Sequence, residues 1–505
     1  GPNQSISTFA TLGVFGRLNY DWKGRYIVEA SARYDGTSRF ASGSRWGFFP
    51  SASAAWRFSE EPFFKPVLDV VSNGKIRFSA GSLGNQQVSN YYYLTKVSSD
   101  NTMSYTFDKS SKAAYSSVSA PVSSGLTWET VIAYDLGLDL DFFDNRLSFT
   151  GDYFIRDTKD MLTASVELPA TYGATSPKEN CANLRTKGWE LSVNWSDKFK
   201  LFGRTASYSV SFGIGDNKTV ITKYYNPTGT LSSNYKGKTL GDIWGYRIDG
   251  LFKSDEEAAE YMSRIDSHEI QPGPYQALSS SLGTGLKAGD PKFRDLNNDG
   301  KITSGAGTLD DPGDREIIGN SRPRFPYSFR LGFNWFGFDI SAFFQGIGHQ
   351  NWYPTGAYGG SAFWGPYSYS EVSFIAKDFM KRVYDPETNT DGYFPRPRAF
   401  ASYSSGNYNL GLGQKNDRYL QNIAYLRFKN LTVGYTLPEN ITRKFYVSKL
   451  RVFFTGENLY YWSPLKKHCT TIDPELANAS SLNTDNTGIG YLYPRTISFG
   501  VDVTF

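Results

Sequence analysis

Residues 327–335 read YSFRLGFNW, an alternation of large apolar residues with small, polar or charged ones. Phe336-Gly337 follows as a tight turn, and residues 338–343, FDISAF, repeat the alternation on the return. Successive side chains of a β-strand point to opposite faces, so one face of this hairpin suits hydrocarbon and the other suits water. Such a strand pair is typical of the wall of an outer-membrane β-barrel. We therefore predict an all-β fold, a transmembrane antiparallel β-barrel.

The same alternation recurs along the 505 residues and predicts about thirteen strands. Short turns and long loops connect them alternately, which is typical of periplasmic turns and extracellular loops in outer-membrane barrels. By this rule the final residue, Phe505, lies on the periplasmic side and residue 1 lies outside the cell. The predicted strands are residues 11–20, 26–34, 48–58 and 75–83, a strand that ends at 142, and residues 147–156, 189–195, 207–213, 327–335, a strand from 338, 425–437, 450–461 and 495–505.

Composition agrees with a barrel and disfavours other classes. The hydrophobic content of 39% and the mean hydropathy of −0.44 are ordinary, and no run of about 18 apolar residues predicts a transmembrane helix. Aromatic residues make up 16% of the chain, an enrichment that suits the girdles at the two membrane interfaces. A net charge of +4 without a basic run is too mild to indicate nucleic-acid binding.

The odd number of strands predicts that further polypeptide completes the barrel. A sheet of thirteen strands has two unpaired edges, which hydrocarbon does not tolerate, and bacterial single-chain barrels normally have even strand numbers. We expect an amino-terminal portion to supply the remaining strands. The sequence also begins without a signal peptide, which export to the outer membrane requires.

Three local signals make further predictions. Ser59 stands before Glu-Glu-Pro and predicts a helix start that the serine caps. Residues 254–257, SDEE, form a capping box and predict a short helix through residues 258–262. Cys181 and Cys469 both fall on the loop side of the predicted layout, so a disulfide between them stays open.

Eight short runs, from RYDGTSRF (33–40) to GENL (456–459), resemble the carboxyl-terminal half of SusC/RagA-type TonB-dependent transporters. They occur in the family's order along essentially the whole chain, and their combination is far more specific than any single run. The chain departs from the family pattern in lacking the amino-terminal plug, the TonB-contact segment and about nine of an expected twenty-two barrel strands. The matching runs are RYDGTSRF (33–40), RWGFFPS (45–51), LTWE (126–129), KGWE (187–190), DGLF (249–252), YLRFKNL (425–431), YTLP (435–438) and GENL (456–459).

The resemblance implies an importer of oligomeric nutrients in the outer membrane of a Gram-negative, Bacteroidetes-type bacterium. The implied partners are the amino-terminal plug and barrel portion, TonB through that portion, a SusD-like surface lipoprotein that serves as a lid, and outer-membrane lipid. The implied cargo is a glycan, with an oligopeptide as the alternative within the family. Rival classes are a passive porin or adhesin barrel, and a soluble multi-domain β-protein that binds or cleaves glycans.

Residues 295–302, DLNNDGKI, carry the sharpest chemical motif and lie in the predicted large extracellular loop 226–320. Oxygen-bearing side chains at the first, third and fifth positions, with glycine at the sixth, match the start of an EF-hand-like calcium loop. The acid of position twelve is missing, because Ala306 stands there. The family pattern places an acid at Asp314 instead, and two glycines in the insertion would let it fold back. The predicted ligands of a structural Ca²⁺ are Asp295, Asn297, Asp299, the Lys301 carbonyl and Asp314. The alternative is a polar turn whose acids accept backbone hydrogen bonds.

Aromatic residues gather in two of the long loops. Ring faces stack on sugars and also hold extended peptides. The alternative is a loop that packs on itself or on the lid. The candidate ligand-binding residues are Tyr91, Tyr92, Trp352, Tyr353, Tyr358, Trp364 and Tyr367.

The sequence does not predict an enzyme. Its three histidines, His268, His349 and His468, are far apart in sequence and lie in or next to loops. No GxSxG, HxxxH or phosphate-cradling Gly-Lys-Ser/Thr stretch occurs, and no pair of acids has a spacing that marks general acid–base catalysis. Charged residues on the water-facing side are predicted to form networks inside the barrel, among them Arg33, Asp139, Asp152, Arg156 and Arg330.

Overall fold

The computed structural model describes residues 6–100, 115–119, 121–123, 125–164, 171, 176–271, 285–354, 379–396, 414–469, 472–477 and 493–505. Most of these residues lie in β-strands, which form one large sheet and several two-stranded sheets. Among the described residues, no helix has both the length and the hydropathy that crossing a membrane requires.

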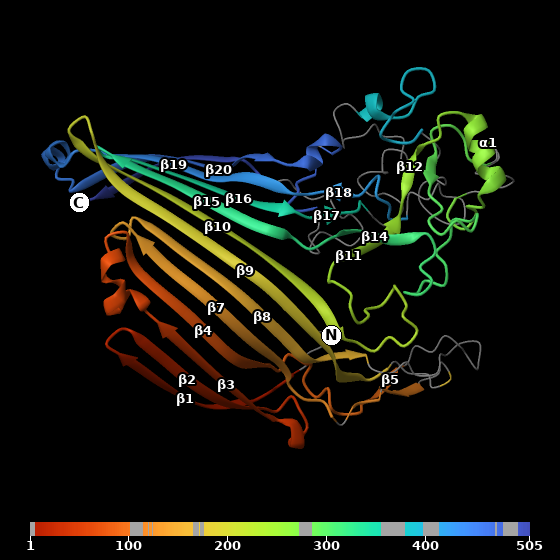
Figure 1. The fold of residues 1–505 in the computed structure, drawn as a ribbon, viewed down its shortest axis with the longest axis horizontal. Coiled ribbons are helices and arrows are strands. Elements are labelled where there is room, and N and C mark those ends of the chain that lie inside the picture. Colours follow the sequence, from red (N-terminus) through yellow and green to blue (C-terminus); the bar gives the residue numbers. More distant parts are fainter. Residues whose placement is uncertain are drawn as a thin grey trace. The chain divides into compact units, whose positions relative to one another are not determined.

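Thirteen strands form the large sheet, and their order in the sheet follows their order in the chain (Figure 1). Hairpin neighbours such as β1 and β2 pair antiparallel, so the prediction of about thirteen antiparallel strands is confirmed. The predicted alternation of short and long connections holds for most of the sheet but not between β2 and β4, because the connection 57–70 between β3 and β4 is longer than the loop 38–45 between β2 and β3. The strands are β1 (Thr11–Trp22), β2 (Tyr26–Thr37), β3 (Trp46–Trp56), β4 (Val71–Asn85), β7 (Glu129–Phe142), β8 (Leu147–Ala164), β9 (Lys178–Leu201), β10 (Arg204–Lys223), β15 (Arg324–Trp335), β16 (Phe338–His349), β19 (Tyr425–Thr436), β20 (Lys449–Trp462) and β21 (Thr496–Thr504).

The chain divides into two compact units, which are described separately. The first comprises Gly1–Leu191, Asn217–Pro227 and Ser233–Thr239. The second comprises Ser192–Asp216, Thr228–Ser232 and Leu240–Phe505.

In the first unit, one side of the strands suits hydrocarbon, and we call it the apolar face. Tyr26 and Tyr34 mark the two ends of its band on β2, a length that suits the roughly 9–11 residues of a tilted membrane-spanning strand. Trp22 stacks on Tyr26 at the turn end, with ring centroids 5.6 Å apart, and Tyr34 stacks on Trp46 at the loop end, at 4.9 Å. Aromatic side chains therefore stand at both ends of the band, as in the girdles of outer-membrane barrels.

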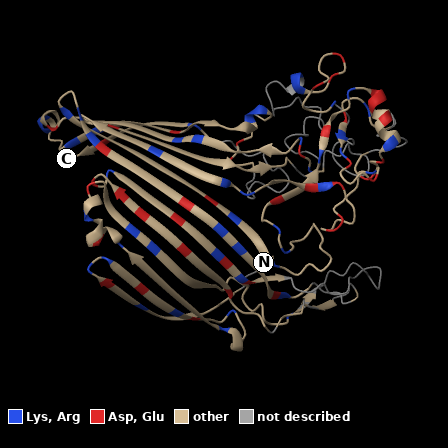
Figure 2. Cartoon of the chain, in the orientation of Figure 1, with Lys and Arg blue, Asp and Glu red and all other residues tan. Residues whose placement is uncertain are grey.

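The opposite side of the same strands carries charged and small polar residues, and we call it the polar face. Arg33 and Asp35 of β2 form an ion pair there, with a distance of 2.6 Å between Arg33 Nε and Asp35 Oδ2. Figure 2 shows basic and acidic residues at intervals along the strands. This separation of the two faces follows from the alternation read in the sequence.

In the second unit, the hairpin of β15 and β16 has the turn that the sequence predicts. Phe336 and Gly337 both have positive φ, 48° and 84°, which a two-residue turn between twisted strands requires. On the apolar face, the Phe344 ring stacks in parallel on Phe329 at 4.4 Å and on Phe428 of β19 at 4.3 Å. These cross-strand stacks stabilise the pairing of the three strands on that face.

Two strands are much longer than the sequence predicts. The expected strand 189–195 is β9 (Lys178–Leu201), and the expected strand 207–213 is β10 (Arg204–Lys223). Charged residues such as Arg185 and Lys187 interrupt the apolar alternation on β9, so the pattern ends before the strand does. Strand pairing needs only backbone groups, and it continues where the side chains lie in water.

One predicted helix cap is wrong and the other is confirmed. Ser59 does not cap a helix, because the 3₁₀ turn η3 (Pro62–Val67) begins after Glu61 and has no side-chain cap. The Glu61 carboxylate instead accepts a hydrogen bond of 2.6 Å from the Tyr26 hydroxyl. Ser254 caps α1 (Asp255–Arg264), since its hydroxyl accepts from the Glu257 amide at 3.2 Å.

The two cysteines lie in different units, Cys181 in the first and Cys469 in the second, so their pairing stays open. Cys181 lies on β9, with its Sγ 3.1 Å from the Thr163 hydroxyl of β8. Cys469 is buried among loop residues of the second unit.

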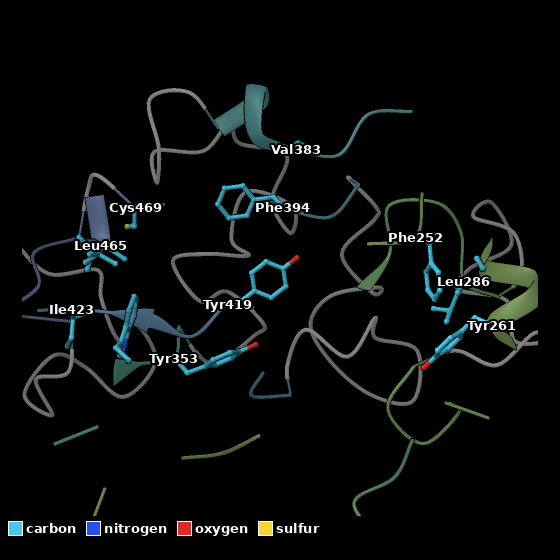
Figure 3. Close-up of a cluster of buried hydrophobic side chains, with 14 residues drawn as sticks. Phe252, Tyr261, Leu286, Tyr353, Val383, Phe394, Tyr419, Ile423, Leu465 and Cys469 are labelled. Atoms are coloured by element: carbon cyan, nitrogen blue, oxygen red, sulfur yellow. The ribbon is translucent and has the colours of Figure 1, made fainter. Parts of the chain in front are cut away.

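The long loops of the second unit pack around a hydrophobic core of their own, drawn in Figure 3. Phe252 contacts the Tyr261 ring of α1 edge to face at 5.1 Å, and both are buried. Side chains from several loops between strands complete this loop core. Its buried members are Phe252, Ala258, Tyr261, Leu286, Trp352, Tyr353, Val383, Phe394, Tyr419, Ile423, Leu465, Cys469, Ile472 and Ala477.

A lysine should destabilise the protein much more on the apolar face of β15 and β16 than on their polar face. Leu331 lies on the apolar face opposite Val210 and Ala342, whereas Ser341 lies on the polar face opposite Gly332. We expect Leu331→Lys to lower the free energy of unfolding from a bilayer by about 2–4 kcal/mol, because the ammonium is placed in hydrocarbon. Ser341→Lys serves as the control and should change it by less than about 1 kcal/mol. Denaturant titration in liposomes measures both, and equal losses would contradict the assignment of the faces.

Candidate functional site

A network of ion pairs crosses three strands on the polar face of the first unit. Arg77 of β4 donates to both Asp139 oxygens, at 2.8 and 3.1 Å, and to Asp152 Oδ1 at 2.8 Å. Lys75 adds a second cation, with its Nζ 3.0 Å from Asp139 Oδ2. Gly137 makes room for the guanidinium, because a Cβ at this position would lie 2.6 Å from Arg77 Cζ. The predicted network around Asp139 and Asp152 is therefore present, although Arg77, its central residue, was not singled out in the sequence.

The other water-facing charges that the sequence singled out have different contacts. Arg33 pairs with Asp35. Arg156 lies over the Phe154 ring at 5.7 Å, and Arg330 lies over the Phe343 ring at 5.4 Å. These arginines therefore lie beside aromatic rings and acids of the same sheet.

A cavity of about 320 Å³ lies at the loop ends of β1 to β4 in the first unit. The Arg33–Asp35 pair and Gly13 line it, and the Phe49 and Trp128 rings meet edge to face at 5.3 Å in its wall. The Trp128 indole donates to the Arg45 carbonyl at 3.1 Å, which holds the ring in place. The cavity thus combines aromatic surface with a cation and a carboxylate. Sequence reasoning missed it because its residues come from strands that are distant along the chain.

Gln86 brings an amide to the same cavity. Its side-chain Oε1 is buried and has no hydrogen-bond partner among the described residues, and its backbone carbonyl accepts from Arg39 Nη1 at 3.3 Å. A buried acceptor without a partner costs free energy unless a donor from outside the chain reaches it. The cavity is therefore equipped for a ligand that carries hydroxyl or amide donors.

In the second unit, a buried ion cluster ties the last loop to the sheet. Arg427 of β19 is only 2% exposed and pairs with Asp473, which is equally buried, through Nη2. Arg427 Nε lies 2.8 Å from Glu475 Oε1, and Lys429 Nζ lies 2.8 Å from Glu475 Oε2. Lys429 is two residues from Arg427 along β19, so both side chains lie on the same face of the strand. The acid Asp473 is visible in the sequence of the last loop, but its partner Arg427 could not be predicted because it lies 46 residues earlier in the chain.

In the acidic turn that the sequence singled out, the carboxylates accept hydrogen bonds from backbone amides of the turn. The Gly300 amide donates to Asp295 Oδ2 at 2.9 Å, and the Lys301 amide donates to Asp299 Oδ1 at 2.8 Å. Asn297 and Asp299 are bonded to each other, with 3.0 Å between Asn297 Nδ2 and Asp299 Oδ2. Ile302 follows the turn and is fully buried with Phe293, which anchors the turn in the loop.

Asp314 folds back onto this turn, as predicted from the insertion between them. It is fully buried, and its two oxygens accept from the Leu296 and Thr303 amides, each at 2.8 Å. Burial raises the pKa of the Asp314 carboxyl, and the charges of Asp295 and Asp299 raise it further. Asp295 and Asp299 thus lie close enough for their charges to act on the Asp314 carboxyl.

The arrangement fits a cation only in part. Asp295 Oδ1 is buried and has no hydrogen-bond partner among the described residues, which suits a metal ligand. The remaining carboxylate oxygens accept backbone or amide hydrogen bonds, as in the polar-turn alternative. Within the described residues, no three His, Cys, Asp or Glu side chains are grouped as a metal site. Of the carboxylate oxygens of this turn, Asp295 Oδ1 is therefore the one available to a cation.

The aromatic candidates are placed differently from one another. Trp352 and Tyr353 are 4% and 5% exposed in the loop core, and the Tyr353 hydroxyl donates to the Gln414 carbonyl at 2.8 Å. Their rings therefore present little surface to a ligand. Tyr358, Trp364 and Tyr367 lie outside the described residues. In the first unit, Tyr91 is partly exposed, and Tyr92 packs against the Phe40–Trp128 cluster.

Comparison with known proteins identifies the chain's relatives. A family model described as TonB dependent receptor-like, beta-barrel matches residues 1–459. The chain belongs to this family. TonB-dependent receptor P3 of Formosa agariphila is 29% identical over 528 residues, which cover 100% of this chain and 46% of that protein. TonB-dependent receptor SusC of Bacteroides thetaiotaomicron is 26% identical over 496 residues, which cover 96% of this chain and 42% of that protein.

The fold is also shared with a solved structure. The structure of the RagAB peptide transporter matches with a TM-score of 0.69 at 21% identity, over 98% of this chain and 48% of that chain. The resemblance to SusC/RagA-type TonB-dependent transporters is confirmed, and the chain is an outer-membrane protein of a Gram-negative bacterium. It spans less than half the length of these curated relatives. In an outer-membrane protein the apolar face meets lipid, and by the general rule for such barrels we expect the short turns on the periplasmic side and the long loops outside the cell.

The buried ion cluster predicts a strong response to loss of its central cation. Arg427→Met leaves Asp473 and Glu475 buried with only Lys429 to oppose them, so we expect local destabilisation of about 3–5 kcal/mol. Arg443→Met is the control, because its pair with Glu439 is exposed and contributes about 0–1 kcal/mol. Hydrogen exchange of residues 472–477 measures the effect, and equal exchange in both variants would refute it.

We expect the stability of the loop core to depend on pH because of the partly buried His468. Its ring stacks on Tyr393 at 3.6 Å, and burial lowers the pKa of the His468 imidazole to about 4, with Lys467, Arg382 and Arg418 adding to the shift. The folded state holds the neutral ring, whereas the unfolded chain takes up a proton below about pH 6.5. Stability should therefore be constant above that pH and fall as the pH drops from 6.5 to 4. Limited proteolysis at pH 7.5 and 5.0 measures this, and His468→Phe should remove the difference.

Proposed function

We propose that this chain is the carboxyl-terminal barrel portion of an importer that carries oligomeric nutrients, chiefly glycans, across the outer membrane. In this proposal TonB supplies energy through a plug, and a SusD-like surface lipoprotein covers the extracellular side. Family membership and the fold shared with RagAB support the proposal. The absence of a catalytic motif in the sequence agrees with transport and binding as its role.

The observation that carries the proposal is the cavity at the loop ends of β1 to β4. The hydroxyls of a sugar are donors for Asp35 and for the unpartnered Gln86 Oε1, and the largely buried Phe49 and Trp128 rings give the cavity an apolar wall for its C–H groups. Arg33 donates to hydroxyl or carboxylate oxygens. The cavity lies next to the polar face, along which cargo would have to pass.

An oligopeptide is the second candidate cargo. The Arg33–Asp35 pair offers one charge to each end of a peptide unit, and the solved RagAB structure, which shares the fold, is described as a peptide transporter. The two cargo classes make different demands on the cavity, since sugars depend on the rings and peptides on the charges.

The importer is tested by uptake of labelled oligosaccharides and oligopeptides in cells that carry the intact transporter. Arg33→Gln with Asp35→Asn removes both charges without leaving one unpaired, and we expect uptake to fall roughly tenfold, since hydrogen bonds to charged groups contribute about 1.5–3 kcal/mol. Arg443→Gln with Glu439→Gln, an exposed pair at a periplasmic turn, should leave uptake unchanged.

Energy dependence separates the importer from a porin. Deletion of TonB should abolish uptake by an importer, whereas a passive porin would continue to conduct. Uptake of glycans that persists without TonB would refute the proposed function. Uptake of peptides in place of glycans would favour the second candidate.

We also propose that the acidic turn holds a structural Ca²⁺ through Asp295, Asn297, Asp299, the Lys301 carbonyl and Asp314. The unpartnered Asp295 Oδ1 and the charges of Asp295 and Asp299 that act on the Asp314 carboxyl support this proposal. A bound cation would neutralise these charges. The turn adjoins the end of α1, because the Ile302 amide donates to the Asp266 carbonyl at 2.8 Å, so the ion would stabilise that part of the loop.

Calcium should raise the unfolding temperature of the intact protein, since an ion at 100 times its dissociation constant contributes about 2.7 kcal/mol. Asp295→Asn should remove most of this increase. Asp310→Asn, an exposed acid of the same loop, is the control and should retain it. Metal analysis of protein purified without EDTA checks the identity of the ion. If the protein contains no bound calcium and its unfolding temperature does not rise when calcium is added, the polar-turn alternative holds.

A further inference from the structure

The apolar face of the first unit contains a groove within the surface that meets lipid. Its volume is about 500 Å³. Gly151 of β8 forms its floor, and the atoms nearest to a Cβ placed there would be those of the Phe149 ring, at 3.3 Å, and of Leu191, at 3.8 Å. Larger residues stand on all sides of this glycine. Its apolar walls are Ile76, Leu136, Leu138, Phe149, Tyr153, Trp189 and Leu191.

The same two strands cross the outer boundary of the membrane just above the groove. On β8 the apolar-face positions change from Tyr153 and Ile155 to Asp157 and Lys159. On β9 they change from Leu191 and Trp189 to Lys187 and Arg185. Charged side chains do not lie in hydrocarbon without compensation, so the boundary of the outer leaflet falls between these groups.

The charges above the boundary have a positive excess. Asp157 pairs with Arg185 through two hydrogen bonds, of 2.7 and 2.8 Å. Lys159 and Lys187 lie close enough to act on Asp157 as well, and both are exposed. Neither lysine forms an ion pair with an acid in the described part of the chain. Three cations thus surround one carboxylate, and the excess of two positive charges matches one phosphate group.

We propose that this surface binds a phosphorylated glycolipid of the outer leaflet. Its phosphate would lie on Lys159, Arg185 and Lys187, and an acyl chain would lie in the groove over Gly151. Basic residues next to an apolar surface at the leaflet boundary are the chemistry that recognises anionic lipids. Lys187 stands two residues from Trp189 of the groove wall, about 6–7 Å along the strand, so headgroup and acyl chain of one lipid reach both parts. The extra length of β8 and β9 beyond the bilayer brings these cations to the headgroups.

The experiment is native mass spectrometry of the intact detergent-purified transporter, reconstituted with either a phosphorylated lipid A or phosphatidylglycerol. We expect the protein to retain lipid A. Lys159→Gln with Lys187→Gln should lower its occupancy roughly tenfold and leaves the Arg185–Asp157 pair in place. Gly151→Leu fills the groove and should lower the occupancy by a similar factor. Lys23→Gln with Arg146→Gln removes two cations beside aromatic rings at the periplasmic turns, and should retain wild-type occupancy.

Equal retention of lipid A by the wild type and both site variants would overturn the proposal, as would an equal loss in the turn control. Preference for phosphatidylglycerol would overturn the assignment to a glycolipid. Photo-crosslinking of a lipid A probe to the wild-type protein does not depend on variant assembly. Crosslinks on β8 and β9 would support the site, and crosslinks confined to other strands would overturn it.

Discussion

Every backbone amide and carbonyl that crosses hydrocarbon must find its hydrogen-bond partner within the protein, because the bilayer offers none. The inner strands of the thirteen-stranded sheet meet this requirement by pairing with two neighbours each, whereas β1 and β21 stand at its edges with one neighbour each. Side chains are left free to differ on the two faces, so apolar and polar residues alternate. The turn between β15 and β16 consists of two residues with positive φ, Phe336 and Gly337. The stacked rings of Phe329, Phe344 and Phe428 lie on the face that meets lipid.

Outside the bilayer the same chain obeys the rules of a water-soluble protein. The long loops of the second unit bury Phe252, Tyr261, Phe394 and Tyr419 in a core of their own, and the Arg427 cluster joins the last loop to the sheet. The acidic turn packs Ile302 inward and turns its carboxylates toward backbone amides.

The polar face gives the interior its chemistry. Arg77 holds Asp139 and Asp152 in fixed positions, and Gly137 leaves room for its guanidinium. Toward the loop ends, the Arg33–Asp35 pair and the Trp128 ring form a cavity suited to polar ligands. On the opposite face of β8, the apolar side chains end at Ile155 and charged side chains begin at Asp157. One alternation therefore creates two environments, one polar and one suited to the membrane.

The sequence by itself determined the fold class, the number of strands, the hairpin turn at Gly337 and the capping of α1 by Ser254, because these depend on neighbours a few residues apart. A motif predicted the return of Asp314 to the acidic turn. The sequence did not predict the ends of β9, where strand pairing continues beyond the apolar pattern. It also wrongly predicted that Ser59 caps a helix, whereas η3 begins after Glu61 without a side-chain cap. Only the tertiary structure decided that Trp352 and Tyr353 are buried, that Arg427 meets Asp473, and that Arg33, Phe49 and Gln86 share a cavity. The physical reason is that these contacts join segments tens of residues apart, and their formation depends on strand register and loop packing, which no local pattern specifies.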